Sequence, residues 1–78
     1  MPTVLRMGPF RFFFYSGDGG EPRHVHVESG DGEAKYWLDP IALERNRGFG
    51  KKDLNRIEQI IEDHVDLLRN AWDGFFNP

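Results

Sequence analysis

The chain has 78 residues, a formal net charge of −3 and no cysteine. A chain of this length forms one small domain with a thin hydrophobic core, so residues 1–78 are expected to fold as a single domain. The absence of cysteine excludes a disulfide framework, a thiolate zinc site and a cysteine nucleophile.

Membrane insertion and secretion are not expected. No apolar run approaches the ~18 residues that a membrane-spanning helix needs. The N-terminus lacks the long apolar stretch of a signal peptide. The sequence therefore predicts a cytoplasmic protein with no membrane partner.

The first half of the chain has the composition and alternation that are typical of β-strands. Gly8-Pro9 separates the first two predicted strands, and a loop rich in glycine covers residues 16–22 before the third. In the second strand Phe10, Phe12 and Phe14 share one face. The four predicted strands cover residues 3–7, 10–15, 24–28 and 33–38.

The third and fourth strands can be placed in register. A tight turn at residues 30–31 gathers the apolar residues on one face, whereas a slip by one residue would mix core and solvent faces. This register sets Glu28 opposite Glu33, a mildly unfavourable pair. The core face then carries Val25, Val27, Ala34 and Tyr36, and the other face carries His24, His26, Lys35 and Trp37.

Residues 41–45 are compatible with a short fifth strand or with a helical turn after Pro40, and the alternation of Ile41 and Leu43 favours the strand. A loop is predicted at 46–50. From 51 to 76 apolar residues recur at spacings of three and four, which predicts one long helix. Its stripe contains Leu54, Ile57, Ile61, His64, Leu68, Ala71 and Phe75.

These elements predict an α+β domain. An antiparallel meander of four to five strands at 1–45 precedes one long C-terminal helix packed on one sheet face. The apolar stripe of the helix covers about half of its circumference, more than one sheet face needs. The surplus predicts a partner, either a second copy of this chain bound through the helix or a small cognate protein.

Two histidines lie in the segment His24-Val25-His26 and share one face of the third strand. Their Cα atoms are about 6.5–7 Å apart, which allows them to hold one metal ion or to flank one phosphate. The same pattern is typical of a plain, half-exposed strand, and these alternatives remain open. Glu28 points the same way but lies ~13 Å from His24 along the strand.

The third histidine, His64, lies within the apolar stripe of the predicted helix. Such a residue is commonly a core histidine bonded to a backbone carbonyl or a tyrosine. Alternatively it meets the sheet beside the strand histidines and divides acid and base roles with them. The candidate catalytic residues are thus His24, His26 and His64, and the candidate metal ligands are His24 and His26.

Basic residues concentrate between residues 45 and 56, and acidic residues between 58 and 73. The basic segment is either a solvated surface or a local phosphate-binding patch. No recognised nucleic-acid motif accompanies it. The candidate phosphate-binding residues are Arg23, Lys35, Arg45, Arg47, Lys51 and Lys52.

The order of these motifs resembles a small bacterial family, the domain-of-unknown-function family 4160. The resemblance lies in Glu21-Pro22-Arg23-His24-Val25-His26-Val27-Glu28, Gly32-Glu33-Ala34-Lys35, and His64 with Leu67-Leu68 and Trp72. Family members often read Pro-Pro-His-Phe-His where this chain has Pro22-Arg23-His24-Val25-His26. They usually carry Gly-x-Leu-Pro where this chain has Gly48-Phe49-Gly50. The resemblance implies a neighbouring small protein and a toxin–antitoxin-like pair, and it strengthens the three histidines as candidates.

Three functions follow from these observations. The chain is expected to be one component of a toxin–antitoxin-like pair that docks a cognate protein, and more specifically an RNA-directed toxin. Such a toxin would be a metal-independent ribonuclease that uses a histidine pair and needs no cofactor. The alternatives are a non-catalytic, antitoxin-side binding protein and a small metal-binding module. In that module His24 and His26, joined by His64 or a carboxylate, would hold zinc, nickel or iron.

Overall fold

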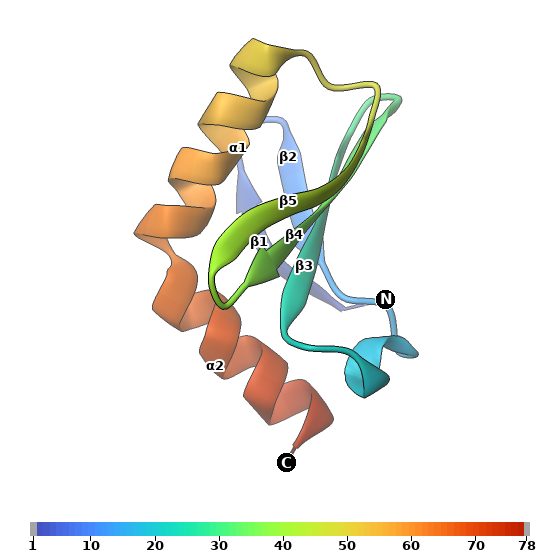
Figure 1. The fold of residues 1–78 in the computed structure, drawn as a ribbon, viewed down its shortest axis with the longest axis vertical. Helices are drawn as coiled ribbons and strands as arrows, with labels where there is room; N and C mark the ends of the chain where they lie inside the picture. The colour runs from blue at the N-terminus through green and yellow to red at the C-terminus, as the bar shows by residue number, and fades with distance from the viewer. Residues whose placement is uncertain (1, 78) are drawn as a thin grey trace.

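The structure is a computed structural model that describes residues 2–77. Five strands form one antiparallel sheet in the sequential order β1-β2-β3-β4-β5, and two helices run one after the other along one side of it (Figure 1). The strands are β1 (Thr3–Met7), β2 (Phe10–Phe13), β3 (His24–Ser29), β4 (Gly32–Leu38) and β5 (Ile41–Arg47). A single 3-10 turn, η1 (Asp18–Gly20), precedes β3, and the helices are α1 (Lys51–Asp63) and α2 (Val65–Phe76).

The hydrophobic core lies between the sheet and the helices. Along β4 every second residue is buried, which is the expected pattern for a strand with one face on the core. Helix α1 contributes Ile57 and Ile61, and α2 contributes Leu68 and Trp72. The sheet supplies the remaining buried apolar side chains, among them Phe10, Phe12, Phe14, Val25, Val27, Ala34, Tyr36 and Leu38.

The predicted register of the third and fourth strands is confirmed. Val27 pairs with Ala34 and Val25 with Tyr36, and Glu28 lies opposite Glu33. Gly30 has a positive φ of 57°, which is the conformation that the tight turn requires and that glycine adopts without strain.

Residues 41–45 form a strand, as their alternation indicates, and not a helical turn. The strand is longer than predicted, because its pairing with β4 continues to Arg47 opposite Glu33. The loop predicted at 46–50 therefore shrinks to residues 48–50.

The prediction of one continuous helix is wrong, because the helix is broken at His64. The backbone of His64 has φ −123° and ψ 21°, outside the helical region. Its ring Nδ1 lies 2.8 Å from the carbonyl oxygen of Ile60, and a side chain that binds the preceding turn competes with regular helix geometry. A straight helix of this length would measure ~39 Å. The longest extent of the molecule is 35 Å, and both halves of the bent helix contribute buried side chains to the core.

No helix in the part of the chain that the structure describes has the length and apolarity needed to cross a membrane.

Tyr36 makes the stability of the fold sensitive to alkaline pH. The side chain is 1% exposed and its hydroxyl donates to the carbonyl oxygen of Leu54 at 3.3 Å. Burial, and secondarily the charge of Glu58, raises the pKa of Tyr36 from 10.0 to about 12. Because this acid is harder to ionise when folded, its contribution is present below about pH 10 and is lost between about pH 10 and 12.

The free energy of unfolding should therefore fall by about 3 kcal/mol across that pH window, from two pKa units at about 1.4 kcal/mol each. Urea unfolding at pH 7 and in steps up to pH 12 measures this loss. Tyr36→Phe should flatten the dependence and cost about 1 kcal/mol at pH 7 through its lost hydrogen bond. The control is Tyr15→Phe at an exposed position, where the pKa of the tyrosine is also raised, chiefly by burial, but by less than that of Tyr36. An equal flattening in the control would contradict the assignment to Tyr36.

Candidate metal centre

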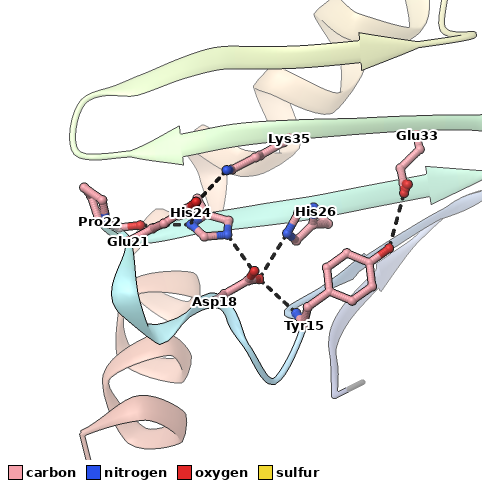
Figure 2. Close-up of polar contacts among 8 residues, drawn as sticks. All are labelled: Tyr15, Asp18, Glu21, Pro22, His24, His26, Glu33 and Lys35. Atoms are coloured by element: carbon pink, nitrogen blue, oxygen red, sulfur yellow. Dashed lines mark hydrogen bonds and ion pairs between the residues drawn. The ribbon is translucent and has the colours of Figure 1, made fainter.

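The two strand histidines are buried, so the interpretation as a half-exposed strand is wrong. His24 is 0% exposed and His26 is 4% exposed. They lie on the sheet face away from Val25 and Val27, as predicted, but residues 15–22 fold back over this face (Figure 2). The local alternation could not reveal a cover that comes from a separate loop.

Aromatic rings pack around both imidazoles. The ring of His26 is stacked on Phe13 at 5.5 Å and meets the edge of Tyr15 at 4.6 Å. His24 contacts Trp37 of β4 at 5.6 Å and Trp72 of α2 at 4.9 Å. These contacts fix the orientation of the two rings before any ligand binds.

Asp18, in η1, carries a carboxylate that meets both histidines. Its Oδ2 lies 3.1 Å from Nε2 of His24 and 3.0 Å from Nε2 of His26. The same oxygen accepts the backbone N–H of Tyr15 at 2.9 Å, which holds the loop in place (Figure 2). The candidate ligand atoms of these three residues all lie within 4.8 Å of one another. We call Asp18, His24 and His26 the His–Asp cluster.

The tautomer of His24 follows from its other nitrogen. Nδ1 lies 2.9 Å from the backbone carbonyl oxygen of Pro22, and a carbonyl can only accept, so Nδ1 carries the proton. In the neutral ring Nε2 then has a lone pair that faces the Asp18 carboxylate. Nε2 is fully buried and has no hydrogen-bond partner among the described residues. Two acceptors this close in a buried site require a positive charge, either a proton on Nε2 or a bound cation.

The ring of His26 is held in its neutral form by burial. Burial, the largest cause, lowers the pKa of His26 below 6.5, and the neighbouring His24 lowers it further against the opposing charge of Asp18. His26 is thus neutral at pH 7. Neutral imidazole is the form that binds a metal ion.

The spacing of the His–Asp cluster suits a transition metal. Metal–nitrogen and metal–oxygen bonds of about 2.0–2.2 Å place neighbouring ligand atoms about 2.8–3.6 Å apart at octahedral to tetrahedral angles. Both nitrogen-to-Asp18 distances, 3.1 and 3.0 Å, lie in this range. The bond from Nδ1 of His24 to the Pro22 carbonyl is the outer contact that commonly orients a metal-binding histidine.

A second charged pair borders the cluster. Nζ of Lys35 lies 2.7 Å from Oε1 of Glu21 and 4.6 Å from the ring centre of Trp37. The Glu21 oxygen is also 3.7 Å from Nδ1 of His24. The Lys35 ammonium, with its hydrogen bond, lowers the pKa of Glu21 and keeps this carboxylate ionised.

The fold does not place His64 in contact with His24 or His26. Its ring bonds to the Ile60 carbonyl, as in the core-histidine interpretation. Within residues 2–77 it makes no hydrogen bond, ion pair or ring contact with His24 or His26.

The predicted phosphate-binding residues separate into three groups. Arg23 is paired with Asp39 at 2.8 Å and Asp73 at 2.9 Å, while Lys35 is paired with Glu21. Lys51 and Lys52 are exposed at the start of α1. Only Arg45 and Arg47, which line one pocket on β5, are placed together for a ligand.

The candidate ligand that the sequence interpretation missed is Asp18. The segment Asp18-Gly19-Gly20 reads as ordinary turn chemistry, and the spacing from Asp18 to His24 follows no helix or strand period. The available signal was the general expectation that a carboxylate could complete a two-histidine set.

Comparison with known families bears on the whole site. Residues 10–73 match the model of the family described as Domain of unknown function (DUF4160), well over half of the chain. The chain belongs to this family. The DUF4160 match includes all of β2, β3 and β4, and therefore the whole His–Asp cluster. No curated protein and no solved structure matches the chain. The toxin–antitoxin association stays a prediction.

Proposed function

We propose that this protein is a small metal-binding domain that holds one divalent transition-metal ion between Asp18, His24 and His26. The observation that carries the proposal is the buried Nε2 of His24, which has no hydrogen-bond partner within residues 2–77 and faces a carboxylate oxygen at 3.1 Å. A cation at this point would satisfy the buried Nε2 of His24 and the Asp18 carboxylate, and it would replace the hydrogen bond that Nε2 of His26 makes with this carboxylate at 3.0 Å.

The donor set limits the class of ion. Two imidazoles and one carboxylate suit zinc, iron, nickel or cobalt better than magnesium or calcium, which prefer oxygen ligands. Three protein ligands are fewer than a closed structural zinc site uses, so a bound ion would keep a coordination position for water or a small ligand.

The acid–base function expected from the sequence would use the same two histidines. In this geometry one nitrogen of His24 is bonded to the Pro22 carbonyl and the other faces Asp18. This arrangement supports metal ligation more directly than proton exchange with a substrate. Docking of a cognate protein as part of a toxin–antitoxin-like pair stays a prediction of the family resemblance.

Calorimetric titration of chelator-treated protein with Zn²⁺ tests the proposal. The wild type should bind one equivalent, and His24→Gln should weaken binding at least 100-fold by removing one of three ligands. His64→Gln is the matched control, because it removes a histidine that lies outside the cluster, and it should bind as the wild type does. No binding by the folded wild type, or equal losses in both variants, would refute the metal site.

A further inference from the structure

Strand β5 contains a one-residue irregularity that changes which side chains face outward. From Leu38↔Ile41 to Tyr36↔Leu43 the register is regular, but Lys35 pairs with Arg45 rather than with Glu44. Glu44 is thus the extra residue of a bulge, a feature that re-aims the side chains that follow it. It also sets Asn46, whose side chain bonds to the backbone of Phe49, opposite Ala34.

The bulge changes which charged side chains meet across β4 and β5. In unbroken register Glu44 would lie opposite Lys35, and Arg45 would fall on the face of Ala34. With the bulge, Arg45 lies opposite Lys35 and Arg47 opposite Glu33 on the outer face of the sheet. Because Lys35 is ion-paired with Glu21 at 2.7 Å, the main effect of the bulge is to place both arginines, Arg45 and Arg47, on this outer face.

The side chains of Arg45 and Arg47 border a pocket. A pocket of about 290 Å³ is bordered by Glu33, Arg45 and Arg47. Arg45 has no hydrogen bond or ion pair with any residue between 2 and 77, and Arg47 has only a 3.8 Å contact with Glu33 while 80% exposed. The Glu33 carboxylate also accepts the hydroxyl of Tyr15 at 3.4 Å. Both guanidinium groups therefore keep free donors at the pocket.

We propose that this pocket is a binding site for a phosphate group, held by Arg45 and Arg47. Two planar guanidinium groups match both the geometry of phosphate oxygens and a charge of about −2. The volume is at the lower end for ligand pockets, which suits a single phosphate-bearing group. The pocket lies on the same face as His26, two strands away or about 10 Å. The proposal does not depend on a bound metal.

Titration of the chelator-treated protein by two-dimensional NMR tests this site with two probes, inorganic phosphate and hexauridylate. The variants are Arg45→Gln/Arg47→Gln and, as a control of equal charge, Lys51→Gln/Lys52→Gln at exposed positions outside the pocket. Amides of β4 and β5 should shift saturably. The arginine variant should bind at least 10-fold more weakly, and the lysine variant should change less than 2-fold.

If inorganic phosphate binds, and only the arginine variant binds it more weakly, the result supports a site for free phosphate or small phosphate esters. The same pattern with hexauridylate alone supports the site and assigns the phosphate to a nucleic-acid backbone. The proposal is overturned if neither probe binds, or if the lysine variant weakens binding as much as the arginine variant. Because every titration is done without metal, none of these results decides the Zn²⁺ site.

Discussion

Zn²⁺ at about 100 times its dissociation constant is expected to raise the melting temperature of the protein by about 10–20 °C. An ion that binds only the folded state at this excess contributes about 2.7 kcal/mol of stability. In a domain of this size each kcal/mol shifts the melting temperature by roughly 4–8 °C. Thermal unfolding followed by circular dichroism, with and without the ion, measures the effect.

Asp18→Asn should abolish most of this shift while preserving the fold. The amide oxygen of asparagine can still accept the Tyr15 N–H, but the residue no longer supplies the negative charge that the ion needs. Glu21→Gln is the matched control, because Glu21 is a loop carboxylate near His24 that does not belong to the His–Asp cluster. A wild-type shift that persists in Asp18→Asn would contradict the assigned ligand set.

The shift should also disappear in acid, since protons compete with the metal ion for the imidazoles. Burial lowers the pKa of His26 below 6.5, so the folded protein keeps this ring neutral at pH 7. In the metal-free protein this group's contribution to stability is therefore present above about pH 6.5 and is lost as the pH falls through its lower folded pKa. Wild-type melting curves between pH 7.5 and pH 5 should show the loss of the Zn²⁺-dependent shift and, without metal, a fall in melting temperature from protonation of His26. The variant His26→Gln should show neither change.

Trp72→Ala is expected to lower the free energy of unfolding by about 3–5 kcal/mol. The indole is 3% exposed and packs against Phe14 at 5.3 Å, Phe76 at 4.2 Å and His24 at 4.9 Å. Its removal leaves a cavity where α2 meets His24 of β3 and the ring of Phe14. A domain of this length has a total stability on the order of 4–12 kcal/mol, so the loss is a large part of it.

Urea unfolding at 25 °C measures this change. The control is Phe75→Ala on the same helix, which removes a ring that is 43% exposed and should cost less than about 1 kcal/mol. Trp72→Phe should retain most of the stability and the Zn²⁺ affinity, because an aromatic ring still packs against His24. Equal losses for Trp72→Ala and Phe75→Ala would show that α2 is not anchored through Trp72.

Much of the fold could be predicted from local sequence signals. The meander follows from period-two alternation broken by glycine turns, and the register of β3 and β4 follows because only one register joins Val25 and Val27 to Tyr36 and Ala34. The helical region follows from its three-and-four spacing. The break of this helical region at His64 did not follow, since it accompanies a contact between the His64 ring and the Ile60 carbonyl that the spacing of apolar residues does not reveal.

The sequence by itself therefore determined an α+β domain and two histidines on one strand face. The tertiary structure decided what surrounds them, because a loop from outside β3 brings Asp18 to within 3.1 Å of both rings and buries them. It also decided that Arg23 is paired while Arg45 and Arg47 face a pocket, since the bulge in β5 depends on pairing with β4. Contacts between distant segments determine how deeply a side chain is buried and which groups it bonds to. Such contacts do not recur at a regular spacing along the chain, so the sequence pattern does not reveal them.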